Sequence, residues 1–486
     1  MQPRTKIFSH LVKDYIRRSP VVVSNVARVS ELLERMAAAR RTSALVVDSE
    51  GRLSGIVTEQ DVTRRIALRC DGSEPVGDIA TSPVKVVYQE DYLYYAIARM
   101  RRFGWRHMPV VDREYRPVGM IELSDALTVA GDAVIREIEL ISQDDTLDGL
   151  RQIKAAQVEL AGSLFDDNVA GPEIQAVISH INWDIHARLL DTHLAAMADA
   201  GWGTPPVDFA LLIMGSGGRG ENYLYPDQDN GFILDDYPDA DHARIDGFFI
   251  ELAERLTCDL NTIGFPYCNG YVMATNPIWR KTRSQWRQQV DLWRRRRSTV
   301  VVQLADIFFD FQGTYGQIWM AEELRGHVTR MTQSSPALLT ELDREISRIG
   351  VALGWFGRLV VEKDKPGHKG EVNLKHSGTL PLVSSLRLLA LQAGIAETAS
   401  LARIAALKEV GALTDDEADY LSGAFNHITG LLLRQQLTDF RAGRDVSNFV
   451  PPDKLSEREK DILVDSLKAI DGFAKRVHSS FSGEYF

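Results

Sequence analysis

One internal duplication limits what the N-terminal part of this chain can fold into. The apolar run at 44–48 recurs 64 residues later at 108–112, and Gly55 recurs as Gly119 at the same spacing. Since the spacing is kept almost unchanged, the two segments are two copies of one folding unit. Two copies are too few for a solenoid, which needs three or more repeats, so we expect them to pack on each other as a closed pair.

The last segment of each copy contains residues that could bind a ligand. In the first copy it reads Gly-Ile-Val-Thr-Glu-Gln-Asp at 55–61; in the second, at 119–125, Glu122 replaces the threonine. Across 16–130 this pattern resembles a tandem CBS pair, a module that commonly binds adenosine nucleotides between its copies. The resemblance implies AMP, ADP or ATP as ligand, although the Glu122 carboxylate would repel a phosphate. The ligand contacts that it implies are Thr58, Asp61, His107 and Asp125.

A structural interpretation of the same residues stays open. An acid in the first turn of a helix complements the helix dipole, so Asp61 and Asp125 could serve only the helices that they open. His107 follows a basic helix end, which could hold a phosphate tail or be solvated. The pair would then be a structural or dimerising module.

A second, independent signature begins at the apolar strand 209–214. It runs into Gly-Ser-Gly-Gly-Arg-Gly-Glu at 215–221, and Asp227 and Asp229 follow before another apolar strand. Glycines let a backbone approach a triphosphate closely, while serine and arginine side chains add hydrogen-bond donors for its oxygens. Two acids spaced by two on an extended segment point to the same face and can share two magnesium ions.

This arrangement resembles the DNA polymerase β nucleotidyltransferase superfamily, and within it the relatives of the PII uridylyltransferase and the glutamine synthetase adenylyltransferase. The stretch 370–381 resembles a segment that those transferases carry after the catalytic core, but Pro381 and Leu382 replace its final Arg-Asp. The resemblance implies an NTP donor and two Mg²⁺ ions. The residues that it implies are Asp227 and Asp229 as catalytic metal ligands, with Gly215, Ser216, Arg219 and Lys375 binding the nucleotide.

The third carboxylate that such enzymes use to deprotonate the acceptor is not evident. The strand expected to carry it, 266–274, has no acid, and Asn269 stands near the expected place. Asp306 and Asp310 lie among apolar residues, where an unpaired carboxylate is costly, so each needs a metal or a hydrogen-bond partner. Glu221 is a further candidate, or orients Arg219.

From these features we predict an α+β chain with a polymerase β-like core of mixed sheet and helices. The C-terminal part is rich in leucine and poor in glycine and proline, which predicts a helical bundle. The predicted segments are an N-terminal segment (1–15), the tandem CBS pair (16–130, copies at 16–70 and 76–130), the nucleotidyltransferase core with its leading helices (131–334) and a C-terminal helical, substrate-binding-like domain (335–486).

The composition of the chain restricts the classes of partner that it is expected to bind. The formal net charge of −11 disfavours nucleic acid, and no apolar stretch is long enough to span a bilayer. Three cysteines without a Cys-x-x-Cys pair favour a reducing compartment, so we expect a cytoplasmic protein. By analogy, CBS pairs predict a homodimer.

The predicted function is a Mg²⁺-dependent transfer of a nucleoside monophosphate from an NTP to an acceptor hydroxyl, regulated by adenine nucleotide at the CBS pair. The acceptor would be a protein, such as a PII-like regulator, or a small molecule. The alternative is a catalytically silent regulatory protein that senses nucleotides.

Overall fold

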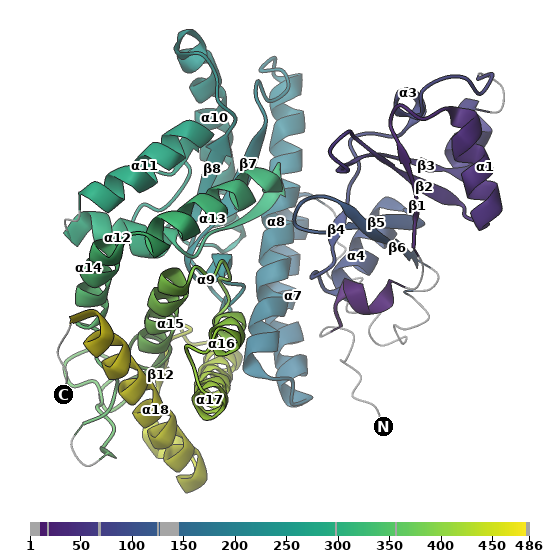
Figure 1. Cartoon of the computed structure of the whole chain (residues 1–486). Helices are drawn as coiled ribbons and strands as arrows, with labels where there is room; N and C mark the ends of the chain where they lie inside the picture. The colour runs from purple at the N-terminus through teal and green to yellow at the C-terminus, as the bar shows by residue number, and fades with distance from the viewer. Residues whose placement is uncertain are drawn as a thin grey trace. The chain divides into compact units, whose positions relative to one another are not determined.

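The chain forms two compact units, residues 1–144 and 145–486 (Figure 1). The computed structural model describes residues 10–16, 19–66, 70–123, 126, 145–296, 299–354 and 357–482.

The first unit contains two three-stranded sheets that repeat one topology. In each sheet the first two strands are parallel, the last two are antiparallel, and a bulge interrupts the antiparallel register at corresponding valines, Val46/Val47 and Val110/Val111. The sequence duplication is thus a duplication of structure down to the bulge. The strands are β1 (Val21–Ser24), β2 (Ser43–Val47) and β3 (Leu53–Thr58) in the first sheet, and β4 (Val87–Tyr88), β5 (His107–Val111) and β6 (Pro117–Glu122) in the second.

One amphipathic helix links the parallel strands of each sheet, at the residues that the sequence predicts: α1 (Val29–Ala39) and α4 (Leu93–Phe103). The helix predicted to open at Asp61 begins two residues earlier, because Thr58 is its N-cap and Asp61 is the third residue of its capping box. The shorter helical turns are Val12–Tyr15, α2 (Glu59–Asp61), the π-helical turn Val62–Ile66 and α3 (Val76–Ile79).

The two copies share a hydrophobic core. Leu45 and Leu53 of the first copy pack with Val111 of the second, and all three side chains are buried. The backbone N–H of Leu53 also donates to the carbonyl oxygen of Tyr115 at 2.9 Å. The copies therefore pack on each other as a pair.

The second unit is built around a four-stranded mixed sheet. Its central strands are buried along their whole length, as their uninterrupted apolar sequences predict. β7 is antiparallel to both of its neighbours, whereas β8 and β9 are parallel. In spatial order the strands are β10 (Gln312–Gly316), β7 (Phe209–Ile213), β8 (Asn230–Leu234) and β9 (Arg280–Thr282).

The strand predicted at 266–274 is an irregular segment, and the partner of β8 is β9 instead. The segment still follows the chain before β8, because the N–H of Gln228 donates to Pro266 and that of Asn230 donates to Val272. Between those two bonds the chain turns outward, and Tyr271 adopts a φ of 54°. This turn breaks the regular pairing that the apolar sequence led us to expect.

Helices surround the sheet, and Figure 1 shows the short helix α9 at the end of the sheet near α15 and α16. α8 contacts α7, α10, α17 and β10, while α13 covers β7 and β10. The helices of this part are α7 (Leu147–Asp166), α8 (Gly171–Asp199), α9 (Gly215–Gly218), the 3-10 turn Asp239–Asp241, α10 (His242–Ile263), α11 (Arg283–Arg295), α12 (Thr299–Phe308) and α13 (Ile318–Gln333).

The C-terminal part is a helical bundle with one short two-stranded ribbon. α17 and α18 pack together, and α15 contacts α14, α16 and α18. The elements are α14 (Pro336–Ile346), β11 (Val372–Asn373), the π-helical turn Lys375–Thr379, α15 (Leu380–Ala393), α16 (Ser400–Glu409), α17 (Asp415–Arg441), β12 (Phe449–Val450), the 3-10 turn Pro452–Lys454 and α18 (Glu457–Ser482).

Candidate active site

The Gly-rich turn after β7 forms α9 and the loop behind it. Gly215 has a φ of 58°, and a Cβ at this position would lie 2.7 Å from Oδ2 of Asp229. Glycine is required here for both reasons. The N–H of Met214 donates to the carbonyl oxygen of Asp229 at 2.8 Å, so the turn and the acidic segment are fixed side by side.

Polar side chains on α8 hold this turn from one side. Gln175 donates to the carbonyl oxygen of Glu221 at 2.9 Å, and Trp183 donates to that of Gly217 at 3.1 Å. The N–H of Asn222 donates to Ser179 at 2.9 Å, and Asn222 in turn accepts from the Ser216 hydroxyl at 3.1 Å. These side chains satisfy backbone groups that the turn leaves unpaired, and so they fix the position of the Ser216 hydroxyl.

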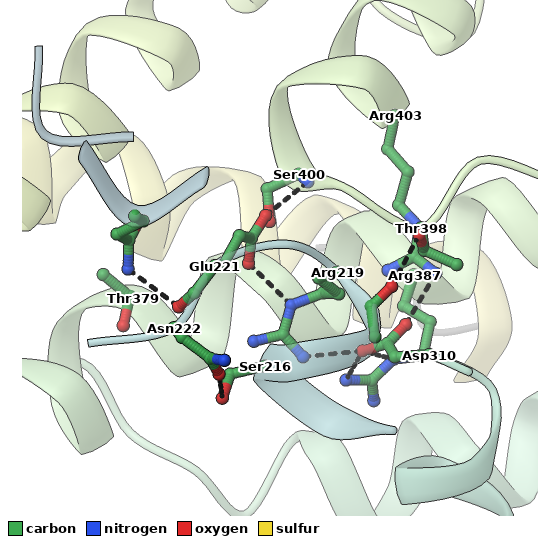
Figure 2. A network of polar contacts seen from close by, with 12 residues as sticks. Ser216, Arg219, Glu221, Asn222, Asp310, Thr379, Arg387, Thr398, Ser400 and Arg403 are labelled. Carbon is green, nitrogen blue, oxygen red and sulfur yellow. Dashed lines mark hydrogen bonds and ion pairs between the residues drawn. The ribbon is translucent and has the colours of Figure 1, made fainter. Parts of the chain in front are cut away.

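Arg219 is held by two acids (Figure 2). Its Nε donates to Glu221 at 2.6 Å and its Nη1 donates to Asp310 at 2.7 Å, while the side chain is only 12% exposed. Burial opposes the charged form, but Glu221 and Asp310 outweigh it and raise the pKa of Arg219. The guanidinium is therefore fixed in place and stays charged, which suits it to bind a phosphate oxygen with its remaining donors.

Asp310 is the centre of an ion-pair network that joins the core to the C-terminal helices (Figure 2). The carboxylate is fully buried and accepts from Arg219, from Nε and Nη2 of Arg387 on α15, and from Nη2 of Arg403 on α16. Burial alone would raise the pKa of Asp310, but Arg387, Arg403 and Arg219 hold it well below its usual range.

The structure supplies the hydrogen-bond partner that each of these two acids needs. Asp310 lies beyond the end of α12, and both Asp306 and Asp310 bind Arg387. Asp310 is therefore a hydrogen-bond partner of arginines and not a metal ligand. The side chains of Arg387 and Arg403 are both buried.

Residues at the start of α16 also contact the Gly-rich turn. The Thr398 hydroxyl donates to the carbonyl oxygen of Gly218 at 3.0 Å, and the N–H of Ser400 donates to Glu221 at 2.6 Å. The Gly-rich turn is thus clamped between α8 and the start of α16. These contacts connect the C-terminal helices to the loop that carries Arg219.

Asp227 and Asp229 lie together at the edge of the sheet, with a third donor beside them. A carboxylate oxygen of each acid and the sulfur of Cys268 all lie within 4.8 Å of one another. Asp227 is exposed, Asp229 is half-buried and Cys268 is buried. Burial and the neighbouring charge of Asp227 raise the pKa of Asp229 to about 7.

The residue beside the two acids is therefore Cys268, whereas the sequence pointed to Asn269. Because 266–274 is irregular and turns at 269–270, the alternation of a strand does not tell which side chain faces the acids. The turn that follows Pro266 decides this, and nothing in the apolar pattern predicts it. Glu221, the other candidate, accepts from Arg219 and from the backbone of Ser400.

The predicted nucleotide-binding side chains line one cavity of about 210 Å³. Ser216 and Arg219 come from the turn after β7, and Lys375 comes from the π-helical turn before α15. Burial lowers the pKa of Lys375, and Asp227 opposes that effect. A smaller hollow on the other side of Ser216 is lined by Asp227 and Asp229. Two cationic side chains and a hydroxyl thus stand next to the paired acids.

The donor set can be compared with what a magnesium ion requires. Mg²⁺ in proteins is commonly bound by one or two carboxylates together with substrate phosphates. Asp227 and Asp229 supply such a pair, and the cationic cavity beside them suits the phosphates. The third donor, a thiol, is not a magnesium ligand.

The raised pKa of Asp229 predicts how stability depends on pH. Between pH 4 and 7 the folded protein binds a proton at Asp229 that the unfolded chain has released, so the free energy of unfolding falls as pH rises through this range. Without added metal, Asp229→Asn should raise the free energy of unfolding by about 4 kcal/mol at pH 8 and leave it unchanged near pH 4. Urea denaturation in EDTA, followed by tryptophan fluorescence at each pH, measures this difference.

The exposed Asp239, replaced by asparagine, is the matched control, and it should show no such pH-dependent gain. A constant difference between Asp229→Asn and wild type from pH 4 to 8 would contradict the prediction.

Three of the predicted ligand contacts of the first unit, Thr58, Asp61 and His107, are among the described residues. Asp61 accepts from the N–H and the hydroxyl of Thr58 at 2.9 and 2.7 Å, as a capping residue does. His107 forms a hydrogen bond with Thr42 at 2.8 Å, and burial lowers the pKa of His107. Asp125 lies outside the described residues. A hollow of about 150 Å³ is lined instead by residues that include Ser19, Arg41 and Glu122.

Comparison with protein families agrees with the order of these parts. CBS domain models match residues 12–68 and 76–132. The model described as "Putative nucleotidyltransferase DUF294" matches 155–299, and "Putative nucleotidyltransferase substrate binding domain" matches 336–481. The chain belongs to the CBS-domain-containing nucleotidyltransferase-like proteins. The predicted fold class is confirmed: a tandem CBS pair, a nucleotidyltransferase-like core with a mixed sheet, and a helical C-terminal part.

Curated relatives are similar over about a quarter of this chain. A homoserine O-acetyltransferase of Methanosarcina acetivorans is 28% identical over 111 residues, which are 23% of this chain and 20% of that protein. An uncharacterized 17.7 kDa protein of Acidianus ambivalens is 30% identical over 105 residues, 22% of this chain and 63% of the relative. The chain thus spans less than two thirds of both.

Solved structures give matches of similar extent. A CBS domain protein from Pyrobaculum aerophilum complexed with AMP is 27% identical and covers 26% of this chain and 98% of its own, with a TM-score of 0.24. A CBS domain pair/ACT domain protein from Thermotoga maritima is 28% identical, with the same coverage and a TM-score of 0.23.

Among the described helices of this nucleotidyltransferase-like protein, none has the length and apolar character needed to cross a membrane.

Proposed function

We propose that the second unit is a Mg²⁺-dependent nucleotidyltransferase that moves a nucleoside monophosphate from an NTP to an acceptor hydroxyl, and that the CBS pair regulates it by binding AMP, ADP or ATP. One observation carries the proposal. Ser216, Arg219 and Lys375, from segments far apart in the sequence, line one cavity beside the paired acids Asp227 and Asp229. The four segments predicted from the sequence, with boundaries after residues 15, 130 and 334, stay a proposal.

The side chains have separate tasks in this mechanism. Arg219, fixed by Glu221 and Asp310, and Lys375 bind the negative charge of the triphosphate, while the Ser216 hydroxyl donates to one of its oxygens. Asp227 and Asp229 would hold the metal, and bound magnesium would neutralise the triphosphate and lower the pKa of the attacking hydroxyl. The hydroxyl oxygen bonds to the α-phosphorus as the bond from that phosphorus to the bridging oxygen breaks. Pyrophosphate leaves, and the hydroxyl proton passes to solvent.

The first test is nucleotide binding by the full chain. We expect calorimetry with each NTP and Mg²⁺ to show binding that Asp227→Asn/Asp229→Asn weakens by at least about tenfold, because the metal can then no longer bridge protein and triphosphate. The matched control is Asp148→Asn/Asp465→Asn, which removes two exposed helical acids and should bind as the wild type does.

Two results would count against this function. NTP binding that needs no metal and survives in the Asp227→Asn/Asp229→Asn variant would place the ligand elsewhere and favour a silent nucleotide-sensing regulator. Metal-dependent NTP binding without pyrophosphate release, for every acceptor tried, would favour the same alternative. The acceptor is proposed to be a protein, such as a PII-like regulator, or a small molecule.

The regulatory part of the proposal concerns the first unit. Arg41 in the hollow there can bind a phosphate, and the Glu122 carboxylate can accept from a ribose hydroxyl. The proposed contacts with the nucleotide remain Thr58, Asp61, His107 and Asp125. To bind the nucleotide, Asp61 would have to give up the hydrogen bonds that it accepts from Thr58. A homodimer in the cytoplasm, with neither membrane nor nucleic acid as partner, completes the proposal.

A further inference from the structure

A thiol lies beside the paired acids of the candidate active site, where a third ligand of a metal ion would stand. The sulfur of Cys268 and one oxygen from each of Asp227 and Asp229 lie within 4.8 Å of one another. Typical metal–ligand distances are about 2.3 Å for a zinc–sulfur bond and about 2.0–2.2 Å for zinc–oxygen. One ion could therefore reach all three donors after small side-chain rotations.

The fold holds the thiol in this place. The N–H of Gln228 donates to Pro266, just before Cys268, and the N–H of Tyr271 donates to the carbonyl oxygen of Cys268 at 3.0 Å. Beyond that turn, the side chain of Asn230 accepts from the N–H of Ala274 at 2.9 Å. The chain on both sides of Cys268 is thus tied to the segment that carries the two acids. Cys268 is 7% exposed, and its sulfur lies within 4.8 Å of a carboxylate oxygen of each acid.

This donor set is not the one that magnesium prefers. Carboxylates suit Mg²⁺, Ca²⁺ and Mn²⁺, whereas a thiolate selects softer ions such as Zn²⁺, and Co²⁺ lies between them in affinity. Three protein ligands with a further position open are also the arrangement of catalytic zinc sites. A hydroxyl or a phosphate oxygen could occupy the open position.

We propose that Asp227, Asp229 and Cys268 together bind one thiophilic divalent cation of the zinc class, through two carboxylate oxygens and one sulfur. The thiol proton passes to solvent as the metal–sulfur bond forms. Any magnesium ion delivered with the triphosphate would then be a second ion, held by the carboxylates and the phosphates. The inference rests on the proposed function for the role of this cleft, but the binding itself needs no nucleotide.

Cobalt is the probe, because Co²⁺ bound to a thiolate has a sulfur-to-metal charge-transfer band in the near ultraviolet. The full chain is titrated with Co²⁺ without nucleotide, and Zn²⁺ is then added to displace it. We expect the wild type to develop the band with about one equivalent of Co²⁺ and to lose it with Zn²⁺. Absence of a band would overturn the proposal.

Three cysteines allow a clean assignment of the sulfur. In Cys70→Ser/Cys258→Ser only Cys268 is left, and neither replaced residue is buried, so the variant should fold and keep the whole band. Cys268→Ser should lose the band and bind Zn²⁺ about tenfold more weakly or worse. A band that disappears in Cys70→Ser/Cys258→Ser, or persists in Cys268→Ser, would overturn the proposal even if the wild type shows one.

The same samples separate this inference from the proposed function. If Mg²⁺-dependent NTP binding requires Asp227 and Asp229 but the wild type shows no cobalt–sulfur band, the inference fails and the function stands. If the band is present but NTP binding does not depend on the two acids, the function fails and the metal site stands. Cys268→Asp, which restores a third carboxylate, should lose the band and shift the preference from Zn²⁺ towards Mn²⁺ and Mg²⁺.

Discussion

Replacing Asp310 with asparagine is expected to lower the free energy of unfolding of the second unit by about 3–5 kcal/mol. One carboxylate accepts from three arginines, and it is fully buried together with two of them, Arg387 and Arg403. An amide offers one acceptor oxygen and no charge, so the guanidinium groups would keep their burial and lose their partner. Urea denaturation followed by tryptophan fluorescence measures the loss.

A matched control for this substitution is Asp166→Asn. Asp166 also binds an arginine, Arg441, at 3.3 Å, but both side chains are more than half exposed. An exposed pair of this kind contributes about 1 kcal/mol or less. Equal effects of the two substitutions would show that the buried network does not stabilise the fold and would contradict the prediction.

The effects of replacing Asp310 and of replacing Asp229 should depend on pH in different ways. The pKa of Asp310 lies well below its usual range, so its contribution to stability is complete above the unfolded value of about 3.9 and is lost only as pH falls further. The effect of Asp310→Asn should therefore be constant between pH 5 and 8. The effect of Asp229→Asn grows with pH over the same range, because the pKa of Asp229 is raised.

The sequence was sufficient for the fold wherever a local pattern repeats or is strongly periodic. The duplication at 44–48 and 108–112 becomes two sheets with the same bulge, and the helices at 29–39 and 93–103 begin and end where predicted. The apolar runs on both sides of the Gly-rich turn become the two central strands. In each case the signal lies within a few residues.

The parts that could not be predicted depend on contacts between distant segments. Asp310 was recognisable as an acid that needed a partner, but its partners Arg219, Arg387 and Arg403 lie from 77 to 93 residues away along the chain. The place of Cys268 depends on a turn that breaks the pairing expected for 266–274, so the alternation of a strand does not tell which side chain faces the acids. Neither fact is encoded in local periodicity.

Gly218→Ala is expected to abolish metal-dependent NTP binding and to lower the free energy of unfolding by about 3 kcal/mol or more. A Cβ on Gly218 would lie 1.8 Å from the carbonyl oxygen of Asp310 and 2.6 Å from that of Ile213. Both are backbone atoms, so no side-chain rotation relieves the clash. The turn must move, and it carries Ser216 and Arg219 with it. Calorimetry and urea denaturation of the full chain measure the two effects.

Gly423→Ala tests whether the loss comes from the clash or from changing a glycine in general. Gly423 is an exposed residue within α17, with no atom within 4 Å of the place where a Cβ would stand. Alanine is the better helix former by about 1 kcal/mol, so this variant should be slightly more stable than the wild type and bind NTP equally well. If Gly218→Ala behaved like Gly423→Ala, the close approach of Asp310 to the turn would not matter for the site. The buried network would then stabilise the fold without positioning Arg219 for the phosphates.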